Sequence, residues 1–234
     1  IPYMRKIVGK EHYSDVKNVM IMGGGRTTVH AAQKLPSYME VKIIEQDEKR
    51  CLRLNELLVN NDIMVINGDG RDTSLLLDEG IHHTQAFAAL TNQTETNILA
   101  CLAAKRMGVR KTVALVENIE YVTMAEKLDI GTIINKKTIA ASHIYQMMLD
   151  ADVANVKCLT VANADVAEFV VKPNAKVTRK QVKDLGLPQG VTIGGLVRDG
   201  EGFLVSGTTQ IQAGDSVVVF SKNMFIKKLD KYFT

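Results

Sequence analysis

Between residues 19 and 150, short apolar runs alternate with longer stretches in which apolar residues recur every three or four positions. The short runs have the length of buried strands, and the longer stretches have the period of amphipathic helices. Because parallel strands need a crossover, usually a helix, this alternation predicts parallel βαβ units and a doubly wound Rossmann sheet. We expect strands at 19–22, 40–47, 63–70, 85–91, 112–117 and 132–137, and helices at 27–35, 48–60, 72–81, 94–108, 119–129 and 138–150.

After residue 152 the pattern changes to an alternation of apolar and polar residues at period two. This period is typical of antiparallel strands with one buried face, and it predicts a small α+β domain. Asp199 and Gly200, in the sequence DGEG, separate two such runs and indicate a hairpin turn. We expect strand-rich segments at 157–172 and 191–207, a short helix at 178–190, a strand at 217–220 and a terminal helix at 223–233.

Composition favours an ordinary globular chain with two domains. The 234 residues are 46% hydrophobic and 24% charged, with a formal net charge of +3 and no stripe of lysine and arginine, which argues against binding to nucleic acid. No apolar run reaches the roughly 20 residues of a membrane span, so we expect no direct membrane insertion. The three cysteines, Cys51, Cys101 and Cys158, lack metal-ligand spacing and are expected to be reduced in a cytoplasmic protein.

The chain begins with Ile1 rather than Met, so we expect it to be a fragment of a longer protein. Its first residues are mixed and polar, as in a linker. The expected organisation is a linker at 1–17 from an upstream unit, a Rossmann nucleotide-binding domain at 18–152 and the small α+β domain at 153–234.

A glycine-rich turn follows the first expected strand and opens the first expected helix. Gly23 would allow the tight turn, and Gly25 would let the backbone approach a diphosphate at the helix N-terminus. Thr28 stands where a third glycine normally lets helix and strand pack closely, so we expect a wider spacing or a modified phosphate contact. A glycine turn without a ligand is the alternative. The candidate phosphate loop is Gly23, Gly24, Gly25, Arg26, Thr27 and Thr28.

Polar residues follow three other expected strands. Glu45 ends the second strand, where a carboxylate accepts hydrogen bonds from a ribose diol and disfavours a 2′-phosphate. Gly68 and Asp69 end the third strand, and Thr91 and Asn92 end the fourth. Since open α/β sheets bind ligands at their carboxyl edge, all five positions are candidates for contact with a base or ribose. Glu45 could instead be a solvated acid, and Asp69 a turn residue.

No acid–base group suited to hydride transfer is evident. The five histidines have no carboxylate partner in the second domain that could close over a nicotinamide ring. A nucleotide site without a catalytic group favours a sensor rather than an enzyme. The alternatives are a nicotinamide-dependent oxidoreductase and a Rossmann assembly module that has lost ligand binding.

Five segments together carry a family resemblance: IMGGGRTT, IIEQD, VINGDGRDTSLLLDEGI, LTNQTETNILACLAAKRMG and QIQAGDSVVVF. They resemble the RCK (KTN) proteins over residues 18–234, including the regulatory subunits of bacterial Trk potassium-uptake systems. The resemblance implies a cytosolic, nucleotide-sensing subunit, peripheral to the inner face of the membrane, that binds NAD(H) or ATP/ADP and regulates a membrane potassium transporter. It also implies a homo-oligomer, a dimer or tetramer ring, and a chain that is the second half of a tandem protein.

The resemblance also assigns residues. It places the phosphates on Gly23 to Thr27, the ribose on Glu45, and the adenine or ribose near Gly68 and Asp69, with Thr91 and Asn92 further along the edge. Two positions depart from the family pattern: Thr28 replaces the third glycine, and Leu115 stands where many members have an arginine. We further hypothesise that nucleotide binding changes domain packing through the helix 138–150, whose apolar face carries Ile139, Ile144, Met147 and Met148. The alternative is that this helix belongs to the core.

Overall fold

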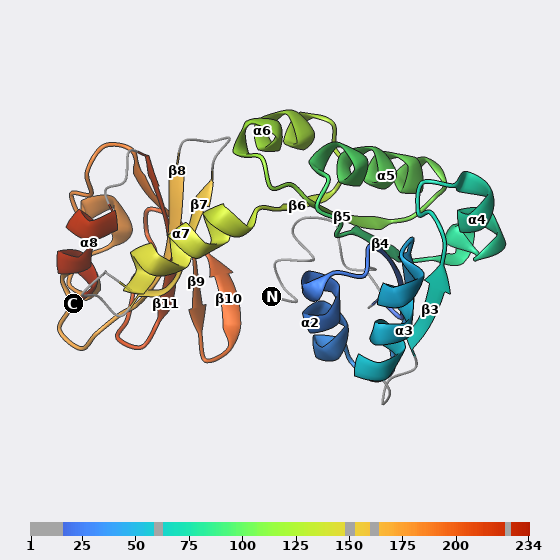
Figure 1. The fold of residues 1–234 in the computed structure, drawn as a ribbon. Helices are drawn as coiled ribbons and strands as arrows, with labels where there is room; N and C mark the ends of the chain where they lie inside the picture. Colours follow the sequence, from blue (N-terminus) through green and yellow to red (C-terminus); the bar gives the residue numbers. More distant parts are fainter. Residues whose placement is uncertain (1–15, 59–62, 148–152, 160–163, 223–225) are drawn as a thin grey trace. The chain divides into compact units, whose positions relative to one another are not determined.

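The computed structural model describes residues 16–58, 63–147, 153–159, 164–222 and 226–234 (Figure 1). Most of the expected linker at 1–17 therefore lies outside the described residues. The described part of the chain divides into two compact units, one comprising residues 16–136 and the other comprising the described residues from 137 onward. The expected division after residue 152 stays a prediction, and the structure groups the helix that follows residue 136 with the second unit.

The first unit is a doubly wound parallel sheet, as predicted. Its strand order is β3-β2-β1-β4-β5-β6, the Rossmann order, and every neighbouring pair is parallel. The order reverses between β1 and β4, which creates a crevice at the carboxyl ends of these strands. The strands are β1 (Asn18–Met22), β2 (Glu40–Glu45), β3 (Ile63–Asn67), β4 (Ala86–Ala89), β5 (Lys111–Leu115) and β6 (Thr132–Ile134).

Side chains of β1 alternate between two cores, one on each face of the sheet. Val19 and Ile21 pack with Leu54 on one face, whereas Met20 and Met22 contribute to the core on the other. A strand buried on both faces must be apolar throughout, which is why VMIM shows no alternation. The helices are α2 (Arg26–Lys34) and α3 (Glu48–Leu57) on the first face, and α4 (Thr73–Asp78), α5 (Thr94–Arg106) and α6 (Ile119–Lys127), with the 3₁₀ turn η1 (Ile81–His83), on the second.

The sixth strand is shorter than predicted. It ends at Ile134, and the next helix, α7 (Lys136–Met147), begins two residues later. Asn135 between them is buried, and its side-chain amide donates to the backbone carbonyls of Val116 (2.7 Å) and Glu117 (3.3 Å). These hydrogen bonds hold Asn135 outside the strand, so β6 ends at Ile134. The apolar and polar pattern of TIINKK gives no sign of such bonds. The expected positions 148–150 lie outside the described residues.

The second unit contains a five-stranded antiparallel sheet of order β10-β9-β11-β8-β7. Asp199 and Gly200 have φ of 51° and 82°, so they form the two-residue hairpin turn predicted from DGEG. One face of the sheet packs against the terminal helix α8 (Ile226–Phe233), where Phe169 stacks on Phe233. The strands are β7 (Val153–Leu159), β8 (Ala164–Val170), β9 (Val191–Arg198), β10 (Glu201–Leu204) and β11 (Ser216–Lys222).

The helix predicted at 178–190 is wrong. The chain there makes two 3₁₀ turns, η2 (Lys176–Thr178) and η3 (Val182–Asp184). The N–H groups of Val182 and Lys183 donate to the carbonyls of Thr209 and Gly207 instead of entering a helical ladder. Throughout the described parts of the chain, no helix has the length and apolar character needed to cross a bilayer.

Candidate functional site

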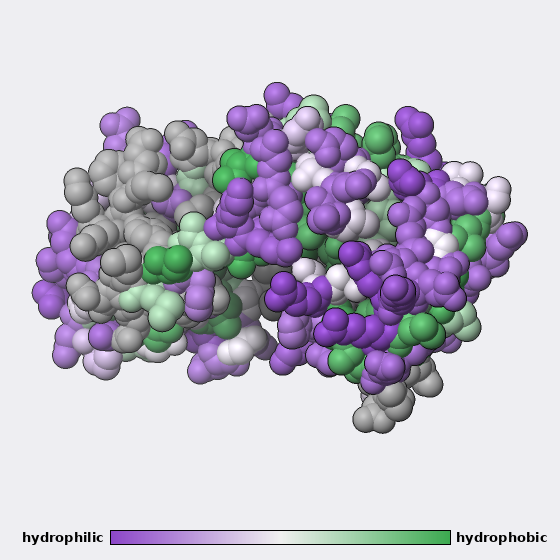
Figure 2. All heavy atoms as spheres, viewed as in Figure 1, coloured by the Kyte–Doolittle hydropathy of each residue, from purple (hydrophilic) through white to green (hydrophobic). Residues whose placement is uncertain are grey.

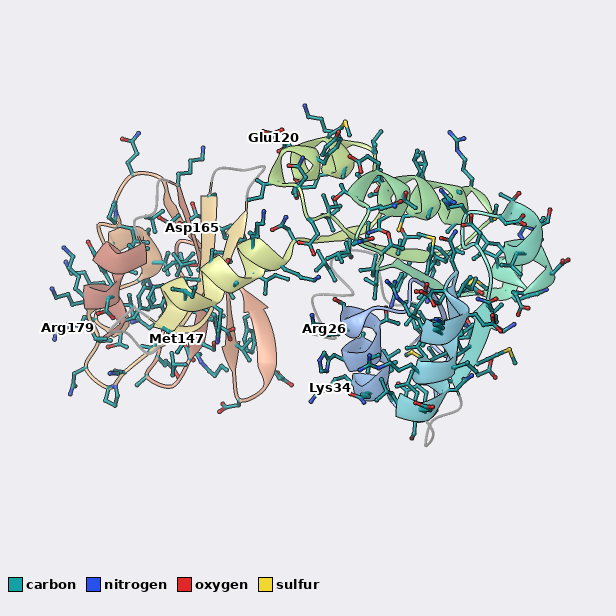
Figure 3. The ribbon with its side chains drawn as sticks, in the orientation of Figure 1. Arg26, Lys34, Glu120, Met147, Asp165 and Arg179 are labelled. Atoms are coloured by element: carbon teal, nitrogen blue, oxygen red, sulfur yellow. The ribbon has the colours of Figure 1, made fainter. Side chains whose placement is uncertain are left out.

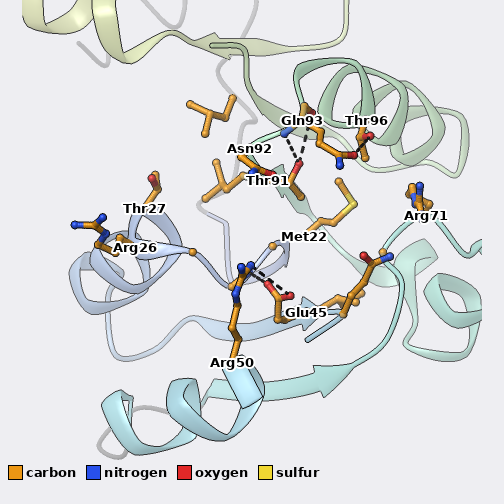
Figure 4. Close-up of a pocket in the computed structure, with 18 of the residues that line it drawn as sticks. Met22, Arg26, Thr27, Glu45, Arg50, Arg71, Thr91, Asn92, Gln93 and Thr96 are labelled. Atoms are coloured by element: carbon orange, nitrogen blue, oxygen red, sulfur yellow. Dashed lines mark hydrogen bonds and ion pairs between the residues drawn. The ribbon is translucent and has the colours of Figure 1, made fainter. Parts of the chain in front are cut away.

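A cavity of about 560 Å³ opens at the carboxyl edge of the parallel sheet, within the size range of small-molecule sites (Figure 4). We call it the edge cavity. It lies at the reversal of strand order, where open α/β sheets bind their ligands. Nine predicted site residues line it: Gly23, Gly24, Gly25, Arg26, Thr27, Glu45, Asp69, Thr91 and Asn92. The predicted residues Thr28 and Gly68 do not.

Gly23 makes the turn from β1 to α2, as predicted. Its φ is 101°, a conformation that L side chains rarely adopt, and its N–H donates to the carbonyl of Ile44 at 2.8 Å. A Cβ atom here would also lie 3.0 Å from the Thr91 side chain. The loop can therefore approach the end of β4 this closely only with glycine.

Gly25 is a glycine that the protein itself does not require. It is the N-cap of α2 with φ −76° and ψ 178°, which any residue adopts, and a Cβ placed there would meet no atom within 4 Å. No side chain caps α2, and no described acceptor takes a hydrogen bond from the N–H groups of Gly25, Arg26 or Thr27. The space beside Gly25 and these free donors fit a phosphate group at the positive end of the helix.

Thr28 acts within the turn rather than on a ligand. Its side chain is fully buried, and its hydroxyl donates to the carbonyl of Gly23 at 2.5 Å. The expectation that Thr28 modifies a phosphate contact therefore gains no support from its position. Thr28, which stands in place of the third glycine of the motif, instead stabilises the backbone conformation of the first glycine, Gly23.

Glu45 is the last residue of β2 and is 7% exposed. Its two carboxylate oxygens accept from the N–H groups of Gly24 (2.6 Å) and Asp47 (2.9 Å), and the Arg50 guanidinium lies 4.0 Å away. Because each carboxylate oxygen can accept two hydrogen bonds, capacity remains for a ribose hydroxyl. Glu45 thus holds the glycine loop in place and presents its remaining lone pairs to the cavity (Figure 4).

Asp69 is already paired with a cation. The Arg71 guanidinium makes a bidentate contact with its carboxylate, at 3.0 Å from Nε and 2.7 Å from Nη2, and lowers the pKa of Asp69 to about 2. Gly68, by contrast, serves packing, since a Cβ there would lie 2.5 Å from the Leu75 side chain. Of the two residues expected at the end of the third strand, Asp69 lines the edge cavity and Gly68 does not.

Asn97, which the sequence reading did not single out, fixes the end of β4. It is fully buried in α5; its Oδ1 accepts from the Thr91 hydroxyl (2.6 Å) and N–H (3.1 Å), and its Nδ2 donates to the carbonyls of Thr91 and Leu115 (2.8 Å each). Four hydrogen bonds from one side chain join the carboxyl ends of β4 and β5. The sequence alone does not show that an asparagine inside a predicted helix makes such hydrogen bonds.

Charged residues that the sequence reading missed complete the rim. Arg50 approaches Glu45, Arg71 pairs with Asp69, and Lys136 contacts Glu117 at 2.8 Å. The rule that the carboxyl ends of parallel strands converge, applied to the fifth and sixth strands, would have found Glu117 and Lys136. Leu115 presents a buried apolar side chain to the same region. The remaining newly found lining residues are Met22, Ile44, Gln46, Gly70, Leu90, Gln93 and Thr96.

The edge cavity has binding chemistry without evident catalytic chemistry. Arg26, on its wall, forms no ion pair with any described residue and is a free cation for an anionic ligand. Across the ranges that the structure describes, no three His, Cys, Asp or Glu side chains come together as metal ligands. No histidine lines the cavity.

Comparison with known proteins places the chain in a family. Residues 19–136 match the TrkA-N domain and residues 166–234 match the TrkA-C domain. The chain belongs to the TrkA-N domain family. The TrkA-N match ends at Lys136, where the first compact unit also ends.

Among curated relatives, the Trk system potassium uptake protein TrkA of Vibrio alginolyticus is 34% identical over 210 residues, covering 88% of this chain and 45% of the relative. The TrkA of Haemophilus influenzae is 30% identical over 221 residues, covering 93% and 48%. The chain therefore spans about half the length of these relatives.

Solved structures share the fold at low sequence identity. The GsuK RCK domain aligns with a TM-score of 0.54 and 16% identity, covering 100% of this chain and 52% of that chain. The GsuK channel bound to NAD aligns at 0.52 and 14%, covering 100% and 43%. These likenesses show that the fold of this chain recurs in solved structures.

Proposed function

We propose that this chain is a cytoplasmic, nucleotide-sensing regulator of a potassium uptake transporter, and that the edge cavity binds NAD(H) or ATP/ADP. The observation that carries the proposal is Gly25. Neither its backbone conformation nor any neighbouring atom requires a glycine, yet a side chain there would fill the space in front of the free N–H groups of α2. A phosphate group explains all three features at once.

The relatives support the biological setting. Curated relatives are named Trk system potassium uptake proteins, and one structural neighbour is the GsuK channel in an NAD-bound form. The proposed partner is a membrane potassium transporter subunit, with the chain at the inner face of the membrane. The cavity walls offer hydrogen-bond donors, cations and three carboxylates, each held by backbone N–H groups or by a cation of the chain, and no histidine, so we favour sensing over oxidoreductase chemistry.

The proposed signal leaves the cavity through α7. This helix begins with Lys136 and Lys137 and has no acidic residue in its first turn, although cations are disfavoured at a helix N-terminus. Glu117 compensates Lys136 at 2.8 Å. A ligand phosphate competes with Glu117 for Lys136, so an occupied cavity alters the charge balance at the start of α7.

The apolar face predicted for α7 is exposed in this chain. Ile139, Ile144 and Met147 are 57%, 59% and 74% exposed, whereas Met148 lies outside the described residues. Large apolar side chains on one helix favour docking on a second copy, and we propose a homo-oligomer, a dimer or tetramer ring. Light scattering of the purified chain tests this, and a monomer at high concentration would contradict it.

Isothermal titration with NADH, NAD, ATP and ADP tests the ligand proposal. We expect saturable heat without substrate turnover, and about tenfold weaker binding of the ligand after Glu45→Ala, because a ribose contact and a loop contact are both lost. The matched control is Asp47→Ala, which removes the α3 cap but leaves the Glu45 side chain. No heat of binding with any of the four nucleotides would favour the assembly module. Conversion of NADH to NAD with a substrate would favour an oxidoreductase.

A further inference from the structure

A second hollow of about 470 Å³ lies on the outer side of the glycine loop, between α2 and α3. We call it the α2–α3 groove. Its floor is apolar: Leu54 is buried, Val29 is half-buried, and Leu57 is 48% exposed. Its rim carries the guanidinium groups of Arg26, Arg50 and Arg53.

The rim charges are not neutralised within the chain. Arg26 and Arg53 form no ion pair with any residue in the described part of the chain, and the carboxylates nearest to Arg50 are 3.9 and 4.0 Å away. Helix α2 contains no acidic residue, and Arg26 and Lys34 project from its two ends (Figure 3). In Figure 2, hydrophilic side chains dominate the face of α2 and α3, with hydrophobic side chains between them.

We propose that the α2–α3 groove docks an acidic amphipathic segment of a partner protein. Carboxylates of the segment would pair with the arginines, and one or two apolar side chains would cover Leu57 and Leu54. Guanidinium–carboxylate pairs are bidentate and directional, and partly desolvated pairs beside an apolar floor contribute to specificity. The imidazole of His30 is the one aromatic ring among the described residues that line the groove. Three guanidinium groups beside an apolar floor match the carboxylates and apolar side chains of a protein segment, which we favour over single-stranded nucleic acid.

The groove and the edge cavity share one wall. Gly24, Gly25, Arg26 and Arg50 line both hollows. Arg26 and Arg50 can turn to a nucleotide phosphate on one side or to a partner carboxylate on the other, but not fully to both. Nucleotide and acidic segment are therefore coupled negatively, and the coupling is reciprocal. This part of the inference rests on the proposed function, whereas docking itself does not.

Fluorescence polarisation with a labelled synthetic peptide tests the docking. The peptide carries Glu and Leu at helical spacing so that one face is acidic and the adjoining face apolar. We expect Arg53→Glu, which touches only the groove, to weaken peptide binding by about tenfold or more and to leave nucleotide affinity unchanged. The neutral variant Arg53→Gln should give a smaller loss. The matched control is Arg106→Glu, the same charge change at an exposed position of α5 on the other face of the sheet.

The outcomes separate the two proposals. Equal peptide binding by wild type and Arg53→Glu, or no binding by wild type, would overturn the docking site even if nucleotides bind. Arg53-dependent binding to phosphatidylserine vesicles but not to the peptide would replace the partner protein by a membrane and so overturn it as well. Saturating NADH or ATP should weaken peptide binding several-fold. If both ligands bind together without loss, the shared-wall coupling is wrong, whereas failure of nucleotide binding alone overturns only the proposed function.

Discussion

The two sheets of this chain treat their polar side chains in opposite ways. In the parallel sheet, Glu45, Asp69 and Thr91 end their strands at the rim of an open cavity. Directly before β11 of the antiparallel sheet, Asp215 is 1% exposed and receives two hydrogen bonds of 2.7 Å from Arg198. Glu45 at the end of β2 keeps capacity for a ligand hydroxyl, whereas Asp215 is satisfied by its own fold. Substitutions should therefore separate binding from stability according to the sheet they affect.

Gly25→Val should have the largest effect and should act mainly on binding. The valine side chain enters the space that we assign to a phosphate, so nucleotide affinity should fall by about 100-fold or more. The backbone at Gly25 tolerates any residue, so the free energy of unfolding should fall by no more than about 1 kcal/mol, the cost of replacing a glycine N-cap by valine. Titration calorimetry and urea denaturation measure the two effects. A larger loss of stability, or an unchanged affinity for nucleotide, would contradict the assignment of Gly25.

Asn97→Ala should lower both nucleotide affinity and stability, because Asn97 supports the cavity and is also part of the core. Its removal leaves the N–H of Thr91 and the carbonyl of Leu115 buried without their partner, at a cost of about 3 kcal/mol. The end of β4 should also loosen, weakening nucleotide binding. Urea denaturation followed by circular dichroism checks the stability. The control Thr96→Ala removes a half-buried hydroxyl of the same helix that bonds the Gln93 side chain at 2.9 Å, and an equal loss there would refute the role of Asn97.

Asp215→Asn should affect stability alone, by about 2 kcal/mol, since it weakens a largely buried ion pair whose arginine is partly exposed. Burial raises the pKa of Asp215, but hydrogen bonds from Arg198 and from the Gln212 N–H outweigh burial, so the net pKa lies below the ordinary value. The ionised carboxylate therefore stabilises the second unit above the unfolded pKa of about 3.9. This stabilisation is lost as pH falls through the folded pKa.

Hydrogen exchange of residues 191–222 against pH measures this prediction for Asp215. Wild type should lose protection in acid, and Asp215→Asn should show less change over the same interval. Nucleotide affinity should be the same in both proteins. Reduced affinity in the variant would show that the two units are not separable in this way.

The smallest effect concerns Asp69 at the cavity rim. Its pKa of about 2 depends on Arg71, so Arg71→Gln should return the titration midpoint toward the ordinary value near 3.9. Carbon-13 NMR of the carboxyl group follows the titration directly. Because both side chains are exposed, the stability should hardly change. An unshifted midpoint would show that another group holds Asp69 ionised.

Much of the fold follows from periodicity in the sequence. The strand order could be expected because apolar runs alternate with helices, and the DGEG hairpin because only certain residues accept positive φ. The failures have local causes. Asn135 ends β6 early through side-chain bonds to the residues that follow β5. The N–H groups of Val182 and Lys183 donate to carbonyls of the loop near Thr209. Such bonds join residues distant in sequence, so no local sequence pattern predicts them.

The candidate site divides in the same way. The glycine loop and Glu45 could be placed by their spacing, because each lies next to a strand end that the pattern reveals. Asn97 and Arg50 could not, since their roles depend on which side chains face them in space. Gly68 and Thr28 show the converse case, in which residues of a binding motif serve packing and turn geometry.

Asn135 has a mechanical consequence. Its side-chain amide donates to the carbonyls of Val116 and Glu117 directly before α7 begins, so these hydrogen bonds fix the position of the first residue of the helix. The 12 residues of α7 extend about 18 Å from that position at about 1.5 Å per residue. A tilt of about 10° at the first residue carries the far end about 3 Å. A rotation of α7 about Asn135 would therefore move the far end of the helix much farther than its first turn.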